Sequence, residues 1–309
     1  MVQVWRSLAG LPDLGRTVVT VGNFDGVHLG HQQVLRRACE VAGELGLEHV
    51  VAVTFDPHPF AVLRPEHAPP LLTTIETRTE LLGAAGADGV LVVPFDREVA
   101  SWSPERFVAE VIVGALHAKA VVVGANFRFG HKAAGDVSLL HRLGESDDFV
   151  AEGVALDGGP QVWSSTYVRN CLIAGDVEGA AEALGRPYAI QGVVIRGDQR
   201  GRELGFPTAN VPISGLCAPA DGVYAGWVYH AGERLPAAIS IGTNPTFAGE
   251  RDRRVESYVL DRTDLDLYDQ RIEVEFTHRI RGMVAFESVA KLVEVIESDV
   301  AETRRLLGL

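Results

Sequence analysis

Residues 22–31 read Gly-Asn-Phe-Asp-Gly-Val-His-Leu-Gly-His, and they decide how the first half of the chain is interpreted. The stretch follows the apolar run Thr17–Val21 and precedes a segment whose apolar residues share one helical face. This order is typical of a strand, a glycine-rich turn and a helix. His28 and His31 stand where the helix is expected to begin. A helix start favours an anion such as phosphate, because its first N–H groups are unpaired and the helix dipole is positive there.

The composition argues against several classes of protein. A length of 309 residues exceeds one typical domain, so two domains are expected, and a hydrophobic fraction of 47% supports full-sized cores. The formal net charge of −13 argues against general binding to nucleic acids or anionic membranes. The three cysteines, Cys39, Cys171 and Cys217, form no zinc or disulfide pattern, which favours a reducing, cytoplasmic location. We see no signal pattern and no apolar run of membrane-spanning length.

The first half of the chain alternates between short apolar strands and helices. The expected strands are Thr17–Val21, Val50–Phe55, Gly89–Val93 and Ala120–Val123, and the helices between them include Thr77–Ala85 and Pro104–Leu116. This alternation predicts an α/β fold with a parallel sheet covered on both faces. Ligands gather at the carboxyl ends of such strands. We therefore expect the turns that begin at Gly22, Thr54 and Gly124 to converge on one crevice.

A further helix is expected after the weaker region 136–160. Ser164, Ser165 and Thr166 come directly before it and are most simply a group of N-cap residues. Arg169 falls in the first turns, where it could reach a phosphate held at the helix start. A helix over Asp176–Leu184 then ends at Gly185, and we place the domain boundary there, which predicts domains 1–186 and 187–309.

The predicted secondary structure changes in the second half, where strand-like runs follow one another with few helices. These runs are Ala189–Arg196, Gly222–His230, Leu235–Ile241, Val255–Leu260 and Ile272–His278. Closely spaced strands of this kind predict a small antiparallel β-barrel, closed by a helix from about Phe286 to Leu307. Arg279 and Arg281, after the last strand, are expected on a solvated rim.

The turn after the first barrel strand, residues 196–210, reads Arg-Gly-Asp-Gln-Arg-Gly-Arg-Glu-Leu-Gly-Phe-Pro-Thr-Ala-Asn. Its glycines and arginines can surround phosphates with N–H groups and positive charge, although no Gly-Lys-Ser/Thr is present. Thr208 and Asn210 are two residues apart, so on an extended segment both face the same side. Their oxygens are of the kind that suits Mg²⁺.

Glu256 is the candidate general base of the second half. It lies within a strand pattern, where a carboxylate could take the proton from an attacking hydroxyl. The simpler interpretation is an outward residue paired with Arg253 or Arg254, which would contribute little to stability.

These segments together resemble the bacterial bifunctional riboflavin kinase/FMN adenylyltransferase family, also called FAD synthetase. The resemblance covers nearly the whole chain, and its motifs keep the family's order. They are residues 23–31, 55–59, 124–127, 164–169, 205–210, 241–247 and 255–256. The resemblance implies a Rossmann-like nucleotidylyltransferase domain followed by a riboflavin kinase-like barrel. It also implies two reactions: riboflavin and ATP give FMN in the barrel, and FMN and a second ATP give FAD and pyrophosphate in the first domain.

The resemblance also implies roles for individual residues. In the first domain His28 and His31 stabilise the phosphates, with Asn126 and Arg169 assisting. Further nucleotide-binding positions there are Asn23, Gly26, Gly30, Ser164, Ser165 and Thr166. In the barrel Thr208 and Asn210 bind Mg²⁺ and ATP, Glu256 is the base, and Gly197, Gly201, Arg202 and Gly205 surround phosphate. Phe127 and Asn244 are assigned to the flavin, although Phe127 or Phe129 is expected in the core.

Two positions depart from the family pattern. Asp269 follows Tyr268 where a glycine is frequent, and Ala285 precedes Phe286 where a lysine is common. Neither change touches a residue assigned to chemistry.

Two other functions stay open at this point. One is an adenylyltransferase with another acceptor, as in relatives that act on phosphopantetheine, but those lack the second domain. The other is a flavin-binding sensor without catalysis, for which we would expect Thr208, Glu256 or the histidines to be replaced. The expected partners are small-molecule substrates, not nucleic acid or a membrane, and the sequence gives no indication for or against self-association.

Overall fold

The computed structural model describes residues 2–155, 163–197, 201, 204–213, 215–242, 253–262 and 264–309. By the density of its internal contacts the chain divides into two compact units, Met1–Ser164 and Ser165–Leu309. The domain boundary after residue 186 stays a prediction.

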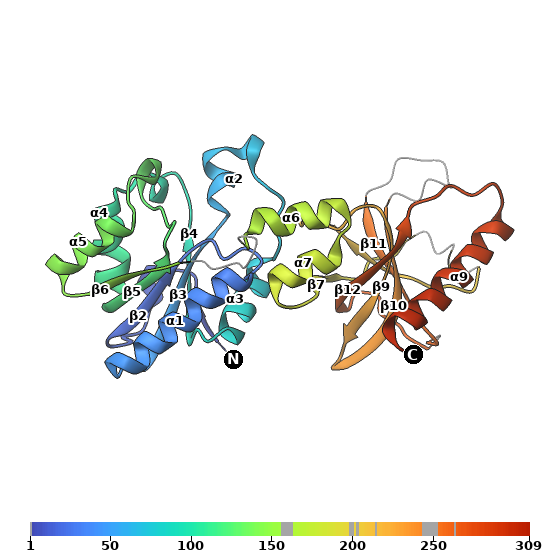
Figure 1. The fold of residues 1–309 in the computed structure, drawn as a ribbon, viewed down its shortest axis with the longest axis horizontal. Coiled ribbons are helices and arrows are strands. Elements are labelled where there is room, and N and C mark those ends of the chain that lie inside the picture. The colour runs from blue at the N-terminus through green and yellow to red at the C-terminus, as the bar shows by residue number, and fades with distance from the viewer. Residues whose placement is uncertain are drawn as a thin grey trace. The chain divides into compact units, whose positions relative to one another are not determined.

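The first unit contains a six-stranded parallel sheet in the order β1-β4-β3-β2-β5-β6 (Figure 1). The strands are β1 (Gln3–Trp5), β2 (Thr17–Val21), β3 (His49–Asp56), β4 (Gly89–Pro94), β5 (Ala118–Gly124) and β6 (Val150–Val154). The predicted parallel α/β sheet is confirmed, and the four expected strands are β2 to β5. The sequence analysis missed the two edge strands, β1 and β6.

Helices cover both faces of this sheet, because successive side chains of a strand point to opposite sides. On one face Val18, Val50 and Ala120 pack against Val34 and Ala38 of helix α1 (Leu29–Leu45). Helix α3 (Ile75–Ala84) packs on the same face, where Leu82 contacts Val90 and Val92. Burial of both faces explains why the central strands are mostly apolar, without a polar residue at every second position.

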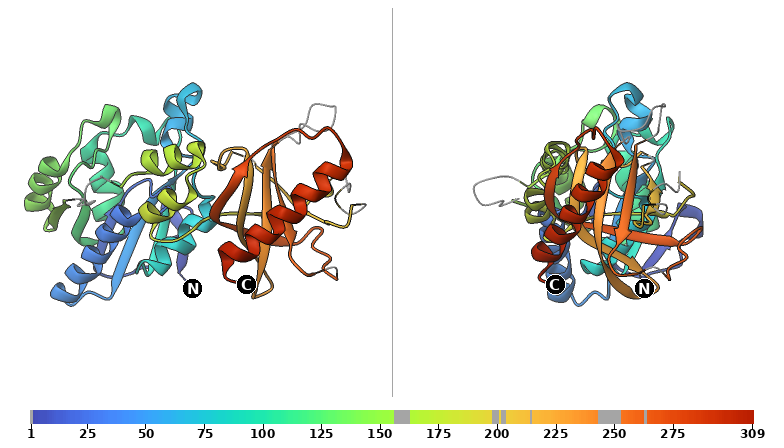
Figure 2. Two further views of the ribbon diagram at one scale, coloured as in Figure 1. Left: turned by 45° about the vertical axis from the view of Figure 1, so that its right-hand side comes forward. Right: turned by 90° about the vertical axis from the view of Figure 1, so that its right-hand side faces the viewer.

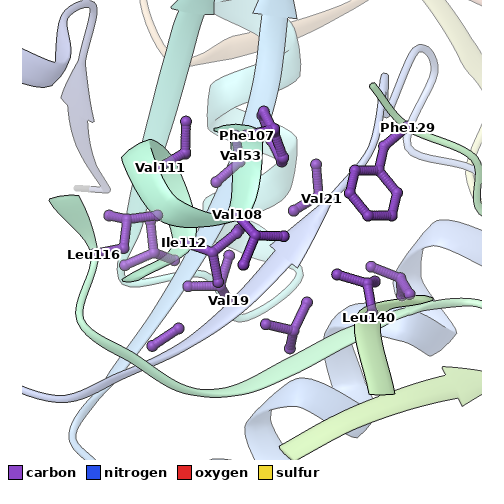
Figure 3. Packing of buried hydrophobic residues seen from close by; sticks show 14 of the residues in the cluster. Val19, Val21, Val53, Phe107, Val108, Val111, Ile112, Leu116, Phe129 and Leu140 are labelled. Carbon is purple, nitrogen blue, oxygen red and sulfur yellow. The ribbon is translucent and has the colours of Figure 1, made fainter. Parts of the chain in front are cut away.

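The other face is covered by α4 (Pro104–Phe107), the π-helical segment η4 (Val108–Ala115) and α5 (Val137–Asp147). Figure 3 shows Val19, Val21 and Val53 of the sheet in one buried cluster with Ile112 and Leu116. Phe129 belongs to this cluster and is buried, as expected for one of the two phenylalanines. The smaller helical elements of the unit are α2 (Pro59–Leu63), η1 (Leu8–Gly10), η2 (Pro65–His67), η3 (Val99–Ser101) and η5 (His131–Ala133).

The second unit begins with α6 (Ser165–Ala174) and α7 (Val177–Leu184) and continues as an antiparallel sheet in the order β7-β12-β9-β10-β11-β8. The strands are β7 (Tyr188–Val193), β8 (Ala209–Pro212), β9 (Gly222–His230), β10 (Glu233–Gly242), β11 (Arg254–Val259) and β12 (Arg271–Gly282). A bridge between Ile195 and Asn210 brings the two edges of the sheet together, so the sheet is nearly closed. The predicted barrel is confirmed, and only β8 was not expected as a strand.

The closing helix, α9 (Val289–Leu307), lies along the barrel, as both views of Figure 2 show. It begins at Ser288, whose side chain accepts a hydrogen bond from the N–H of Lys291. Inside the barrel fully buried apolar residues such as Ile190, Val211, Ile239 and Val274 form the core. In the described part of the chain no helix has the length and apolar character needed to cross a membrane.

Candidate active sites

The two histidines of the first stretch lie together at the start of α1. His28 is the N-cap residue and His31 falls in the first turn. Their rings are stacked, with centroids 3.6 Å apart and planes at 24° to each other. The pair therefore presents two imidazoles beside the unpaired N–H groups of a helix start, which is the arrangement that the sequence predicts for an anion site.

The environment of His31 favours its neutral form. Burial lowers the pKa of His31 well below its usual range, and the neighbouring His28 and Arg78 lower this pKa further. The Nδ1 atom of His31 is inaccessible to solvent and has no hydrogen-bond partner among the described residues. A bound phosphate would reverse the electrostatic part of this balance, because a nearby negative charge favours the protonated ring.

Two glycines of the turn are required by its geometry. Gly26 has a φ of +84°, a conformation that side chains rarely adopt, and its N–H donates to Thr73 Oγ1 at 3.2 Å. At Gly30 an added Cβ would lie 3.1 Å from two atoms of the His28 ring. An alanine at position 30 would therefore displace the imidazole.

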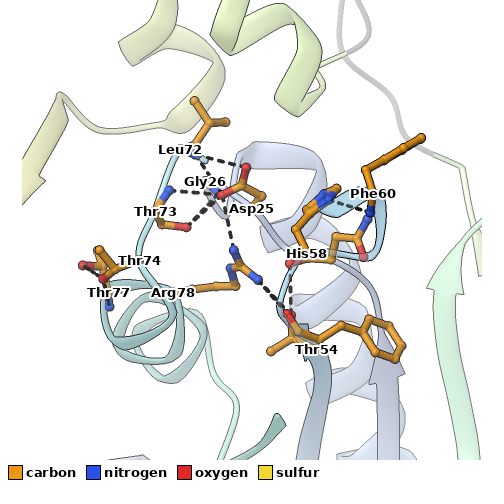
Figure 4. A network of polar contacts seen from close by, with 12 residues as sticks. Asp25, Gly26, Thr54, His58, Phe60, Leu72, Thr73, Thr74, Thr77 and Arg78 are labelled. Carbon is orange, nitrogen blue, oxygen red and sulfur yellow. Dashed lines mark hydrogen bonds and ion pairs between the residues drawn. The ribbon is translucent and has the colours of Figure 1, made fainter. Parts of the chain in front are cut away.

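A buried carboxylate that the sequence analysis did not single out fixes this turn. Asp25 accepts hydrogen bonds from the N–H groups of Leu72 (3.0 Å) and Thr73 (3.1 Å), and from Thr73 Oγ1 (3.2 Å). Arg78 of α3 lies 3.5 Å from the same carboxylate, and the side chains of both residues are 2–3% exposed. Figure 4 shows these contacts meeting at Asp25. They join the histidine turn to the segment before α3.

The turn needs such support because its backbone is strained. Phe24 and Val27 have positive φ values, +50° and +42°, although neither is a glycine. A β-branched residue such as Val27 rarely occupies this region. The hydrogen bonds of Asp25, which lies between these two residues, compensate for the strain. In the sequence, only the charge of Asp25 within the glycine-rich motif could have indicated its structural role. Its partner, Arg78, is too distant along the chain to form a recognisable pattern with it.

The turn after β2 contacts the end of β3, whereas the convergence of three turns on one crevice stays a prediction. The hydroxyl of Thr54, near the end of β3, donates to the carbonyl of Asn23 at 3.0 Å. Arg78 also donates to the carbonyl of Phe55 at 3.3 Å. The turn after β5 follows the neighbouring strand of the sheet, with Asn126 exposed and Phe127 stacked on Phe129 at 5.4 Å between centroids. A contact of Asn126 or Phe127 with a ligand stays a prediction.

The predicted N-cap group lies at the division between the units. Ser164 ends the first unit, whereas Ser165 and Thr166 open α6 and belong to the second. Arg169 lies in the same helix and is 9% exposed. Their role in nucleotide binding stays a prediction.

The second site is a cavity of about 530 Å³ at the barrel. The predicted residues that line it are Gly197, Gly201, Gly205, Thr208, Asn210 and Glu256. The structure thus brings together every described residue that the sequence assigned to phosphate, metal and base in this half. Arg202 and Asn244 lie outside the described residues.

The pairing of β8 with β11 places Glu256 beside the predicted metal ligands. Glu256 is the register partner of Asn210, so the two side chains emerge from adjacent strands on the same face. The Asn210 amide group donates to the carbonyl of Thr208 at 3.2 Å and lies 3.4 Å from its hydroxyl. Arg253, which the simpler interpretation pairs with Glu256, instead binds Asp221 at 2.6 Å.

The glycines of the loop allow these close approaches. A Cβ at Gly197 would lie 2.7 Å from the Asn210 side chain, and one at Gly201 would lie 2.4 Å from the carbonyl oxygen of Phe206. Gly205 has a φ of +88°. The backbone therefore folds tightly around the polar end of the cavity, and larger residues at these positions would displace it.

Much of the remaining wall of the cavity is apolar. Phe206 meets Tyr258 edge to face, with centroids 5.3 Å apart, and Met283, Phe286 and Ile296 line a further side. A cavity with one polar and one apolar end suits a ligand that has a phosphate and a flat, apolar ring.

The departure at Asp269 is accommodated in the turn where it occurs. Asp269 has a φ of +60°, the left-handed conformation that favours glycine, and its N–H donates to the carbonyl of Val194 at 3.0 Å. Aspartate tolerates this conformation better than most residues. Ala285, the other departure, is exposed between β12 and α9.

Comparison with known proteins identifies the family of each half of the chain. The family model for FAD synthetase matches residues 11–166, and that for riboflavin kinase matches residues 184–307. The bifunctional riboflavin kinase/FMN adenylyltransferase of Escherichia coli (strain K12) is 38% identical over 307 residues, which are 98% of this chain and 96% of the relative. The chain belongs to this family.

Other members and one solved structure cover the same length. The family member from Pseudomonas fluorescens is 38% identical and covers 99% of this chain and 98% of its own. A crystal structure described as a macrolide-efflux protein from Streptococcus pneumoniae is 31% identical, with a TM-score of 0.86 over 97% of this chain and 98% of that one. The family models and the relatives therefore assign both halves of the chain to the riboflavin kinase/FMN adenylyltransferase family, and the solved structure shares the fold over nearly the full length.

We predict that Asp25→Asn destabilises the first unit by about 3–5 kcal/mol, because it removes the charge that pairs with the buried Arg78. Urea unfolding, followed by a probe in the first unit, measures this loss. Glu76→Gln is the matched control, since Glu76 pairs with Arg6 at the surface of the same helix and its loss costs at most about 1 kcal/mol. Equal losses in the two variants would show that the buried pair has no special role.

We also predict that His31 makes the first unit less stable in mild acid. Folding lowers the pKa of His31, so near and below the unfolded pKa of about 6.5 the unfolded chain binds more protons than the folded chain. The free energy of unfolding therefore decreases as the pH decreases. Urea unfolding at pH 7.5 and 5.5 should therefore show a larger loss for the parent than for His31→Gln. An identical loss in both would contradict this prediction.

Proposed function

We propose that the chain makes FAD in two steps, with the barrel cavity phosphorylating riboflavin and the histidine turn adenylylating the resulting FMN. The family supplies the two reactions. The observation that supports the assignment of residues best is the register of β8 and β11, which sets the Glu256 carboxylate beside Asn210 in a cavity with one apolar end. A general base must be within reach of the hydroxyl that it deprotonates, and the position of Glu256 in the wall of the cavity supports this role.

In the barrel Glu256 takes the proton from the ribityl 5′-hydroxyl of riboflavin. The oxygen attacks the γ-phosphorus of ATP, the bond to the β-phosphate oxygen breaks, and FMN and ADP leave. The glycine-rich loop around Gly197 and Gly201 surrounds the phosphates. Positioning and neutralisation of charge account for most of the acceleration in such transfers.

Mg²⁺ fits the oxygens of Thr208 and Asn210. Both side chains carry a neutral, hard oxygen, the Asn210 amide nitrogen lies 3.4 Å from the Thr208 hydroxyl, and the Glu256 carboxylate is on the adjacent strand. No group of three or more acidic, histidine or cysteine side chains that could hold a metal occurs in the described residues, which suits an ion that keeps water and phosphate ligands. When bound, Mg²⁺ would neutralise the charge of the ATP phosphates.

In the first unit His28 and His31 bind the phosphates of the second ATP. A phosphate oxygen of FMN attacks the α-phosphorus, the bond to the β-phosphate breaks and pyrophosphate leaves, so no covalent enzyme intermediate is required. The stacked imidazoles stabilise the developing charge as hydrogen-bond donors. The further positions that we propose for nucleotide binding are Asn23, Gly26, Gly30, Asn126, Ser164, Ser165, Thr166 and Arg169.

The finer assignments belong to the same proposal. Phe127, half-buried on Phe129, is our flavin contact in the first unit. The expected substrates are small molecules, and the widely spaced cysteines of the sequence support a cytoplasmic enzyme.

The proposed function predicts an order of products. Incubated with riboflavin, ATP and Mg²⁺, the purified protein should form FMN first and FAD later, as separated by chromatography over time. FMN alone would contradict the assignment of the first unit, which a direct assay with FMN and ATP then checks. Riboflavin that is bound but not converted would favour a flavin-binding protein instead.

Substitutions should separate the two reactions. Glu256→Gln is expected to lower riboflavin phosphorylation about a hundredfold or more while supplied FMN is still adenylylated. His28→Asn should lower FAD formation by a similar factor and leave FMN formation unchanged. The exposed residues Glu297→Gln and His141→Asn are the controls. If either site variant lowered both reactions equally while remaining folded, the assignment of one site per unit would be wrong.

A further inference from the structure

An ion pair between Arg281 of β12 and Asp299 of α9 lines the barrel cavity. Arg281 Nε lies 2.9 Å from Asp299 Oδ1, and Nη2 lies 2.6 Å from Oδ2, so the guanidinium binds the carboxylate with two parallel hydrogen bonds. The Asp299 side chain is 9% exposed and that of Arg281 24%. Bidentate, largely buried pairs of this kind are more rigid than surface ion pairs. The expectation that Arg281 lies on a solvated rim was therefore wrong.

An irregularity in β12 explains why Arg281 points to the cavity. The pairing of β12 with β9 shifts between Arg279 and Arg281, which are opposite the adjacent residues Tyr224 and Val223. Ile280 is thus an extra residue, and the two arginines face different sides although they are two positions apart. Arg279 donates to the carbonyl of Ala174 at 3.0 Å, whereas Arg281 binds Asp299.

The ion pair links the two ends of the segment that forms one wall of the cavity. We call this wall the 283–296 wall, because Met283, Val284, Phe286, Leu292 and Ile296 line the cavity from it. Arg281 and Asp299 lie just before and just after these residues, 18 positions apart. The guanidinium carbon of Arg281 is also 5.8 Å from the centre of the Phe286 ring. The pair therefore fixes both the segment after β12 and the helix that follows it.

We propose that Arg281 and Asp299 are positioning residues for riboflavin in the kinase reaction. Their ion pair holds the 283–296 wall at the separation that fits the flat, apolar ring of the acceptor, and neither residue touches the reacting atoms. ATP contacts the glycine-rich loop and the Thr208–Asn210 segment on the polar side of the cavity, so the pair acts on one substrate and not on the other. This inference rests on the proposed kinase function of the cavity.

The test measures KM for riboflavin, KM for ATP and kcat of phosphorylation in the full-length protein. Asp299→Asn keeps the shape of the side chain and removes its charge, and it should raise KM for riboflavin roughly tenfold or more. KM for ATP and kcat at saturating riboflavin should stay within about threefold of the parent, because the reacting groups are unchanged. Arg281→Lys keeps the charge but loses the two parallel hydrogen bonds, so a smaller rise is expected.

Two further variants complete the design. Glu294→Gln removes a charge from the exposed Lys291–Glu294 pair of the same helix and should leave every constant unchanged. The double variant Arg281→Met/Asp299→Leu replaces the ion pair by an apolar contact and should recover much of the lost affinity for riboflavin. Circular dichroism and thermal unfolding of each variant report that the barrel is folded.

The outcomes are distinct. Parental KM for riboflavin in Asp299→Asn would overturn the proposal, and so would an equal rise of KM for ATP or a fall in kcat with KM unchanged. A parent protein without kinase activity would instead contradict the proposed function.

Discussion

The histidine site depends on one buried interaction, the pairing of Asp25 with Arg78 and with the N–H groups of Leu72 and Thr73. A turn with two non-glycine residues at positive φ is not stable by local preference alone. The carboxylate within that turn accepts hydrogen bonds from a distant segment and so holds the turn in place. The helix start and both imidazoles follow from the path that this turn takes. The Asp25 carboxylate therefore stabilises the site, whereas other groups, the two imidazoles and the helix start, are those proposed to bind the nucleotide.

The barrel site is organised differently, by backbone pairing. Asn210 and Glu256 come from strands that are far apart in sequence, and the antiparallel register makes them neighbours. A shift of this register by one residue would turn Glu256 to the opposite face, because side chains alternate along a strand. The buried alternation of β11, in which Val255, Ser257 and Val259 face the core, prevents such a shift. The hydrophobic core thus specifies the position of the polar site.

The sequence predicted those parts of the fold in which local pattern and tertiary environment agree. β2 and β9 have the expected bounds, since each is bordered by clear turn residues. β1 is only three residues long, and β6 has no regular alternation, so neither gives a local signal. The site motifs were found because their residue types are unusual for their positions. Asp25–Arg78 and Arg281–Asp299 were not found, because an ion pair between distant residues leaves no periodic pattern in one sequence.

The extra residue in β12 has a consequence for how this strand can vary. Arg279 holds the end of α6 through the carbonyl of Ala174, and Arg281 holds α9 through Asp299, so two helices depend on the opposite orientations of these arginines. Deletion of Ile280, or insertion beside it, would turn one arginine away from its helix without changing any side chain that binds it. The number of residues between Arg279 and Arg281 therefore matters more than the identity of residue 280. Homologous chains should accept substitutions at position 280 far more readily than insertions or deletions there.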